Sequence, residues 1–224
     1  MKKLFLLVCL CSLAFAAFSQ DEKPESNRPA SPEISALQTA AGLVKYGYAN
    51  YSATALVEAA KIFAETKTQP LDVEAEHGRN ESVTEKSNPV SFEPTQLLAD
   101  AKKFARKDKP ILAYIKQVEK SIVSGSTRGA VGGPKIQKER VLGKDVDSYK
   151  VKFWAKELAE VCVSGDGDTD LDLYVYDENG NLIESDTDYT DECAVRWVPA
   201  WTGTFIIKIV NRGALYNNYV IWTN

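Results

Sequence analysis

Four aspartates recur at every second position within the segment GDGDTDLDLYVYDENG at 165–180: Asp166, Asp168, Asp170 and Asp172. Clustered carboxylates are the natural ligands of Ca²⁺, which takes about six to eight oxygens. The first three aspartates have the one-three-five spacing of a calcium loop. The sixth position is Leu171, where an EF-hand needs glycine, so the segment is not an EF-hand.

A β geometry offers a different calcium site. Leu171, Leu173 and Val175 would point inward along a strand, so Asp170 and Asp172 would point outward beside the first loop. A second acidic loop follows, and two acidic loops drawn together repel each other without a cation. We therefore expect Ca²⁺ as the cofactor, with these ligands: Asp166, Asp168, Asp170, Asp172, Asp186 and Asp188. The alternative is a set of solvated turn aspartates that bond the local backbone.

The sequence holds candidate residues for two further kinds of chemistry. Tyr174 and Tyr176 share the outward face of the expected strand, and Trp197 or Trp201 could join them in stacking on sugar rings. The alternative is that these rings belong to the core, as in other sandwiches. His77 is the single histidine and lies in a polar loop without a serine elbow, a cysteine or an HExxH arrangement near it. We expect no enzymatic activity.

Cys162 and Cys193 are the two cysteines that remain beyond the first 20 residues. In an oxidising compartment such a pair is most simply a disulfide. The bridge would close a loop of about 30 residues and stabilise the fold by roughly 3–4 kcal/mol. Two unpaired, buried thiols are the alternative.

The N-terminus has the pattern of a cleaved signal peptide. Lys2 and Lys3 precede an apolar stretch at 4–17, and small residues near Gln20 suit a signal peptidase. The stretch is too short for a comfortable membrane span, and no later segment is a candidate. We expect signal residues 1–19, a flexible leader at 20–30, and a secreted or periplasmic protein.

The rest of the chain divides into a helical part and a strand-rich part. Apolar residues with helical spacing indicate two helical pairs within 31–121, which start at Ser31-Pro32, Ser52, Pro94 and Asp108, with an exposed polar loop at 68–91 between the pairs. A glycine-rich linker follows at 122–135. Some eight short strands in 136–224 predict an antiparallel sandwich, so the fold class is α + β multidomain with a jelly-roll-like second domain.

Charge is distributed unevenly between the two parts. Residues 145–224 contain 15 acids and 6 bases, a net charge of −9, whereas residues 21–144 carry a net charge of +3. A domain with this negative charge repels nucleic acid and anionic membranes. We therefore expect neither as a partner.

From about Val161 onward the chain resembles the bacterial pre-peptidase C-terminal domain. The likeness is carried by GDGDTDLDLYVYDENGNLI, DTDYTDEC, WTGTFIIKIVN and NNYVIWTN, in that order over about the last 90 residues. The resemblance implies a β-sandwich of secreted enzymes that serves secretion, localisation or binding, and some members bind calcium. In this chain a helical region, rather than a peptidase, precedes the module. The whole protein therefore resembles an uncharacterised secreted type.

These patterns predict a secreted, non-enzymatic interaction protein whose sandwich is stabilised by a disulfide and by calcium. Its partner would be an extracellular protein or a glycan. Two alternatives remain open at this point. The helices could bind the partner while the sandwich serves as a secretion or anchoring tag, or the sandwich could be a carbohydrate-binding accessory module.

Overall fold

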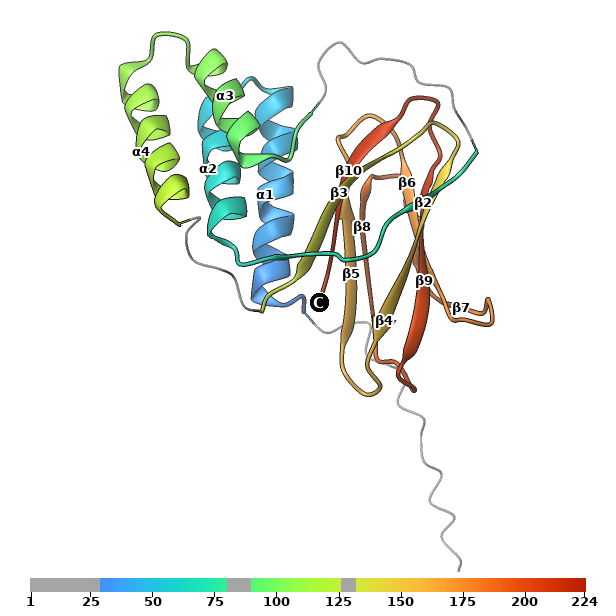
Figure 1. The fold of residues 1–224 in the computed structure, drawn as a ribbon. Coiled ribbons are helices and arrows are strands. Elements are labelled where there is room, and N and C mark those ends of the chain that lie inside the picture. The colour runs from blue at the N-terminus through green and yellow to red at the C-terminus, as the bar shows by residue number, and fades with distance from the viewer. Residues whose placement is uncertain (1–28, 80–89, 126–131) are drawn as a thin grey trace, which may run out of the picture.

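The computed structural model describes residues 29–79, 90–125 and 132–224, which form a helical layer and two stacked sheets (Figure 1). Ser31 and Ser52 cap the first two helices, because their hydroxyls accept bonds from the amides of Ile34 and Ala55, each at 3.4 Å. Proline occupies the first turn of the first and third helices. The predicted starts are confirmed, and the helices are α1 (Pro32–Ala49), α2 (Ala53–Glu65), α3 (Pro94–Ala105) and α4 (Lys109–Gly125).

Eight strands after the helices form the sandwich: β3 (Lys135–Val141), β4 (Val146–Phe153), β5 (Ala159–Ser164), β6 (Leu171–Tyr176), β7 (Leu182–Asp186), β8 (Glu192–Trp197), β9 (Gly203–Asn211) and β10 (Asn217–Thr223). Sheet A has the order β3-β10-β5-β8 and sheet B the order β4-β9-β6-β7. Apart from the β6–β7 hairpin, each connection crosses from one sheet to the other. This is the strand order of a jelly roll, and it confirms the predicted α + β class with an antiparallel sandwich.

A strap from the helical part adds one short strand to each sheet at the same side of the sandwich. β1 (Gln69–Pro70) pairs with β3, and β2 (Glu76–His77) pairs with β4. Between them, the side chain of Leu71 is buried in the inner core of the sandwich. Of the predicted exposed loop at 68–91, residues 69–77 are largely exposed or half-buried as expected. The structure corrects the prediction where 69–70 and 76–77 pair with the two sheet edges and cover them, and where Leu71 is buried. Residues 80–89 lie outside the described residues.

The helices pack on the outer face of sheet A. One apolar core joins the buried faces of the helices to Cys162, Val220 and Trp222, whose side chains leave sheet A on the helical side. A second core fills the space between the two sheets. Sheet A is thus buried on both of its faces, which explains why all six residues of β5 are buried.

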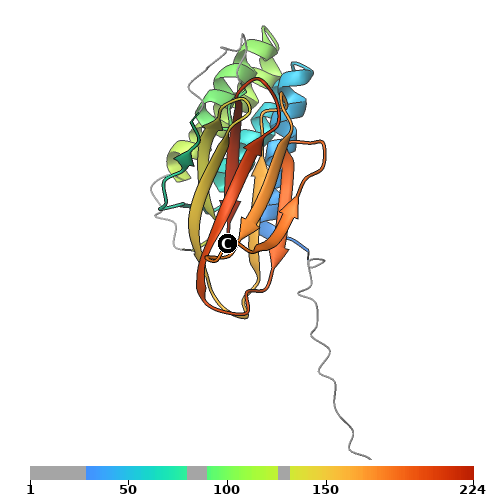
Figure 2. The ribbon, with the colours of Figure 1, turned by 90° about the vertical axis from the view of Figure 1, so that its right-hand side faces the viewer.

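Sheet B has one buried face and one open face. Along β4 and β9, buried residues alternate with exposed or half-buried ones, as expected for a strand that faces a core on one side. Figure 2 shows this arrangement, with the helices behind the strands. The outer face of sheet B is therefore available to a ligand.

The predicted domain boundaries at 31–121, 122–135 and 136–224 stay a prediction. The two parts share the core that surrounds Trp222, so the helical layer is built onto the sandwich. The predicted signal peptide at 1–19 and most of the leader at 20–30 lie outside the described residues. Within 29–79, 90–125 and 132–224, no helix combines the length and the apolar character that a bilayer crossing requires.

The predicted disulfide between Cys162 and Cys193 is corrected by the strand register. Both cysteines are free and buried. Cys193 lies opposite Val163, and Cys162 lies opposite Ala194, so the two thiols leave sheet A on opposite faces. The Cys193 thiol donates to the carbonyl of Leu171 at 3.1 Å. Burial raises the pKa of Cys162 to about 12 and raises that of Cys193 as well.

We expect the two thiols to be unreactive in the folded protein and titratable after unfolding. In a chain that begins at Gln20, Ellman's reagent without reductant should detect no thiol in buffer and two thiols in guanidinium chloride, because the pKa of each buried thiol is raised. Two thiols are expected in guanidinium chloride even when the protein is purified from an oxidising compartment. Detection of no thiol after unfolding would restore the disulfide.

We expect Trp222→Ala to destabilise the helical layer and the sandwich together. The ring is fully buried between them, and removal of a buried aromatic side chain costs about 3–5 kcal/mol. Urea unfolding should show one transition by far-ultraviolet circular dichroism and by tryptophan fluorescence, at a lower midpoint than in the wild type. A matched control is Trp154→Ala, because Trp154 is 58% exposed. Separate transitions of helices and strands would contradict a shared core.

Candidate functional site

The first acidic loop is held together by bonds within the protein. Asp191 accepts from the amide of Gly167 at 2.5 Å and from the side-chain amide of Asn217 at 3.4 Å. Asp166 accepts from the amide of Asn218 at 2.8 Å, and its own amide donates to the side chain of Asn217 at 3.0 Å. Both carboxylates are buried, so these bonds replace the water that they would otherwise bind.

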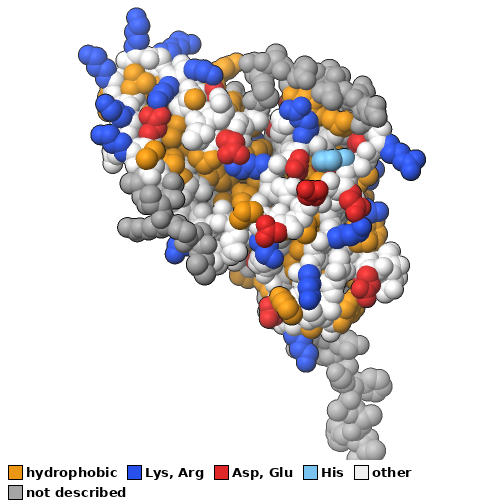
Figure 3. All heavy atoms as spheres, in the orientation of Figure 1, with side chains coloured by type: hydrophobic (Ala, Val, Ile, Leu, Met, Phe, Trp, Pro, Cys, Tyr) orange, Lys and Arg blue, Asp and Glu red, His pale blue; other side chains and the backbone are white. Residues whose placement is uncertain are grey.

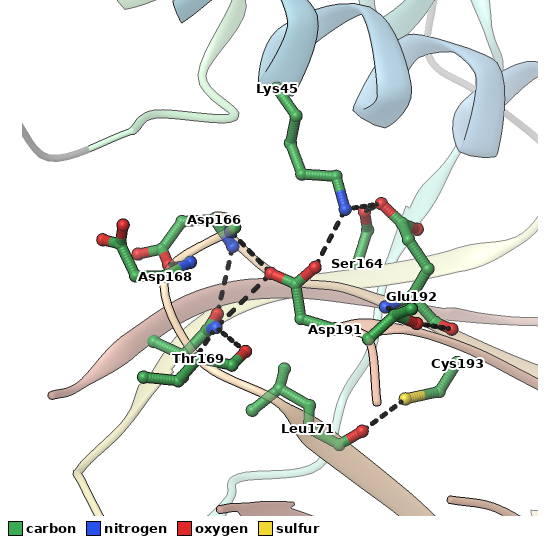
Figure 4. A network of polar contacts seen from close by, with 12 residues as sticks. Lys45, Ser164, Asp166, Asp168, Thr169, Leu171, Asp191, Glu192 and Cys193 are labelled. Carbon is green, nitrogen blue, oxygen red and sulfur yellow. Dashed lines mark hydrogen bonds and ion pairs between the residues drawn. The ribbon is translucent and has the colours of Figure 1, made fainter. Parts of the chain in front are cut away.

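Lys45 connects this loop to helix α1 (Figure 4). Its ammonium group donates to Asp191 at 2.9 Å and forms an ion pair with Glu192. Glu192 also accepts from the hydroxyl of Ser164 at 2.5 Å. Burial lowers the pKa of Lys45, but the bonds to Glu192 and Asp191 outweigh it and raise the pKa. A protein cation therefore pairs with two of the carboxylates at this end of the sandwich.

The other predicted calcium ligands point to different partners. Asp172 is buried and bonds Arg212, with Nε 2.5 Å from the carboxylate. Asp186 accepts from the amide of Ala194 at 2.9 Å, and Asp188 accepts from the amide of Thr190 at 2.8 Å. The remaining two predicted ligands, Asp168 and Asp170, are respectively exposed and half-buried on the first loop.

The structure does not gather the six predicted carboxylates into one cluster. Across the part of the chain that the structure describes, no three or more acidic, histidine or cysteine side chains are gathered as a metal ion requires. Most of the predicted ligands instead accept hydrogen bonds from amides, Arg212 or Thr190. Asp188 fits the alternative of a solvated turn aspartate that bonds the local backbone. Asp166 and Asp172 do not, because they are buried and accept bonds from Asn218 and Arg212, which are distant in the sequence. The calcium site stays a prediction without geometric support.

The outer face of sheet B carries a row of aromatic rings. Tyr174 and Tyr176 point outward from β6 with ring centroids 6.2 Å apart and an interplanar angle of 23°. Trp154 directly follows β4. By the alternation of that strand, its side chain points outward, as those of Lys150 and Lys152 do. Strand spacings of about 4.8 Å and a rise of about 3.3 Å per residue place the row over roughly 20 Å. This row could contact an extended ligand rather than a single small molecule.

A basic side chain lies beside each ring of this row. The ammonium group of Lys208 is 5.2 Å from the centroid of Tyr176, and that of Lys152 is 4.8 Å from the centroid of Trp154. Both distances are within the range of a cation–π contact. Each of these two rings therefore has a positive charge next to it.

The third ring, that of Tyr174, is fixed by a buried carboxylate. Its hydroxyl donates to Asp172 at 3.0 Å and accepts from a guanidinium nitrogen of Arg212 at 2.9 Å. Burial and the bond to Asp172 raise the pKa of Tyr174, so the phenol stays neutral. The bond to Asp172 also raises the pKa of Arg212, which remains a cation. This cluster holds one end of the aromatic row in a single conformation.

Trp197 and Trp201, either of which could have joined the tyrosines, lie elsewhere. Trp197 is buried in the inner core, 4.8 Å from the ring of Phe153 and 5.5 Å from that of Phe205. Trp201 is partly exposed and stacks on Phe205, at 5.7 Å between centroids. The core interpretation is thus correct for Trp197, and Trp201 covers an end of the same aromatic cluster.

Sequence reasoning missed Trp154, Lys152 and Lys208 as members of this face. The alternation SYKVKFW at 148–154 could have identified the first two, because Tyr149, Val151 and Phe153 are the inward residues of that strand. Lys208 could be assigned to the outward side of its strand in the same way. Its position over Tyr176 depends on the pairing of β9 with β6, which no pattern within a single strand reveals.

A second polar cluster ties the strap to sheet B. Nδ1 of His77 is 2.7 Å from the carboxylate of Asp147, which is buried and accepts from the hydroxyl of Tyr219 at 2.7 Å. The hydroxyl of Tyr219 is in turn 2.6 Å from that of Tyr149. The bond to Asp147 raises the pKa of His77, and the charges of Glu139 and Asp145 raise it further. Burial raises the pKa of Asp147.

We expect this cluster to make the stability of the protein depend on pH. Because the pKa of His77 is raised above its unfolded value of about 6.5, its contribution is complete below that pH and is lost as pH rises through the folded pKa. Its side chain is 55% exposed, so the contribution is a few tenths to about 1 kcal/mol. Urea unfolding should give a lower free energy at pH 8.5 than at pH 6, and His77→Gln should remove most of that difference. An unchanged pH dependence in the variant would contradict this assignment.

A cleft separates the helices from the edge of sheet A. It has a volume of about 460 Å³ and lies between residues 90–93 with the start of α3 on one side and β3 with β10 on the other. Hydrophobic side chains gather in this hollow (Figure 3). Lys138 and Glu93, which both line the cleft, form an ion pair at 2.9 Å. The cleft therefore offers paired charges and an apolar floor, in contrast to the ring-and-cation face of sheet B.

The fold and the site define a jelly-roll sandwich with a helical cover on one sheet and an aromatic, basic face on the other. No protein-family model matches the sequence, and no curated protein does either. Similar solved structures include the mitogen of Yersinia pseudotuberculosis, at 12% identity and a TM-score of 0.36. This likeness covers 42% of this chain and 86% of the mitogen.

Two other solved structures show a likeness of the same extent. The pre-peptidase C-terminal domain of a collagenase from Bacillus anthracis has 13% identity and a TM-score of 0.34, with 42% of this chain and 91% of that one covered. The periplasmic inhibitor of g-type lysozyme from Aeromonas hydrophila has 15% identity and a TM-score of 0.32, with 41% and 84% covered. Each of these proteins is thus similar to less than half of this chain.

Proposed function

We propose that this protein is a secreted, non-enzymatic binding protein whose ligand is a glycan. The observation that carries the proposal is the row of Tyr174, Tyr176 and Trp154 on the sheet face that the helices leave open. Aromatic side chains supply large apolar contact areas at a small cost in conformational entropy, and their flat faces suit sugar rings. A relationship to the pre-peptidase C-terminal domain is part of the proposal and rests on the motif at 165–183.

The way in which this face is supported favours binding rather than a packing role. Sheet strands fix the backbone of Tyr174 and Tyr176, and the Tyr174 hydroxyl, which donates to Asp172 and accepts from Arg212, orients the first ring. Leu182, which lies opposite Tyr176 on β7, is more than half exposed and extends the apolar surface. A surface that is ordered before it meets its ligand loses less entropy on binding.

We expect Trp154→Ala and Tyr176→Ala each to weaken glycan binding by about tenfold, because truncation of an aromatic side chain in a binding surface removes on the order of 1–2 kcal/mol. Affinity electrophoresis against a panel of soluble neutral and acidic polysaccharides would identify a binding polymer. Isothermal titration calorimetry of the variants with that polymer would then measure the loss.

Tyr46→Ala is the matched control for this experiment. Tyr46 lies on α1 and is 59% exposed, compared with 58% for Trp154, so its removal takes away a similar exposed ring from another surface. The control should bind as the wild type does. Wild-type affinity in both Trp154→Ala and Tyr176→Ala, or no binding to any polymer of the panel, would contradict the proposal.

A further inference from the structure

We propose that the outer face of sheet B selects acidic polysaccharides, with lysines contacting carboxylate or sulfate groups while the rings contact the sugar faces. This inference rests on the proposed function and names the class of glycan. Its basis is the placement of Lys152 and Lys208 beside the rings of Trp154 and Tyr176.

The distribution of charge over the sandwich supports this selectivity. Residues 145–224 contain 15 acids and 6 bases. Four of these six bases lie on or beside the outer face of sheet B: Lys150, Lys152, Lys208 and Arg212. A concentration of positive charge on one face of an otherwise acidic module creates a local attraction for anions that the rest of the module lacks.

Two acids at this face are matched to two of the bases. Glu76 pairs with Lys150 at 2.6 Å, and Asp172 binds Arg212. Neither Lys152 nor Lys208 forms an ion pair with any carboxylate in the described ranges; each instead lies over an aromatic ring. Two positive charges therefore remain for an anionic ligand.

These two lysines can exchange their contact with an aromatic ring for a contact with an acidic group of the ligand. A cation–π contact at an exposed site contributes about 0.5–1 kcal/mol, which is comparable to an exposed ion pair. An acidic group of a ligand can draw the ammonium group from the face of the ring at little cost. The movement leaves the ring free to contact the sugar that carries the acidic group, so both contacts form together.

The register of the sheet sets the spacing of these contacts. Lys208 lies opposite Tyr174 across the β6–β9 pair, and Lys152 lies opposite Thr204 at the far end of β9. The two lysines are therefore four residues apart along the strand direction, or roughly 13 Å. A polymer with repeated acidic groups can reach both lysines at once, whereas a single acidic sugar reaches one.

The test compares polygalacturonate with the same polymer after its carboxyl groups have been reduced. By isothermal titration calorimetry in 50 mM salt, the full chain from Gln20 should bind the acidic polymer about tenfold more tightly than the reduced one. The double variant K152Q/K208Q should lose this preference while it retains binding to the reduced polymer through the rings. Binding of the acidic polymer by the wild type should weaken as salt is added, and this weakening should be smaller in the double variant, because two of the screened charges have been removed.

The matched control is K109Q/K116Q, which removes the same charge from exposed lysines on α4. It should keep the wild-type preference. Thermal melting of both double variants should stay within about 2 °C of the wild type, because exposed lysines contribute little to stability. Polyphosphate and single-stranded DNA serve as polyanions without the acidic sugar backbone, and neither should compete with polygalacturonate.

The outcomes separate the two proposals. Equal wild-type binding of both polymers, or an unchanged preference in K152Q/K208Q, would overturn the acidic selectivity and leave glycan binding standing. Competition by polyphosphate or DNA as strong as that by polygalacturonate would show attraction by charge alone and would also overturn it. Binding of neither polymer, together with a negative panel of polysaccharides, would overturn both proposals.

Discussion

The burial of sheet A between the helices and sheet B is the constraint on which the rest of the structure depends. The outer side of this sheet presents Cys162, Val220 and Trp222, and an apolar surface of this kind has to be covered. Helix α1 covers it and is fixed near both of its ends. The amide of Ser31 donates to Glu160 at 3.3 Å, and Lys45 binds the acidic loop. Once sheet A is covered, the outer face of sheet B is the sheet surface that remains open.

The same constraint explains how the acidic loops are used. Carboxylates at the end of the sandwich lie close enough to repel one another, and burial and the neighbouring Asp172 and Asp188 raise the pKa of Asp170. The protein offsets this repulsion with Lys45 from the helical layer and with Arg212 from the sandwich. The loops therefore serve to attach the helices and to orient Tyr174, which are tasks that require fixed hydrogen bonds.

Much of the fold could be predicted from local patterns, because they record local physics. Capping serines, prolines in the first turn and alternating strands identified the helices and the jelly-roll-like sandwich. The strap was missed because its strands have two residues each and their pairing partners lie about 66–72 positions later in the chain. The disulfide was wrongly predicted for a related reason. A one-residue offset between Cys162 and Cys193 in the strand register reverses the direction of one thiol, and composition carries no information about register.

The candidate site could be predicted only in part, because local patterns contain no information on how strands pair. The outward direction of Tyr174 and Tyr176 follows from alternation within one strand, whereas the cations beside the rings come from neighbouring strands.

The central position of β10 in sheet A has a consequence for the order in which the protein assembles. β10 lies between β3 and β5, and both apolar cores include its side chains. Because synthesis proceeds from the N-terminus, neither core has all of its side chains before the ribosome has added Asn217–Thr223.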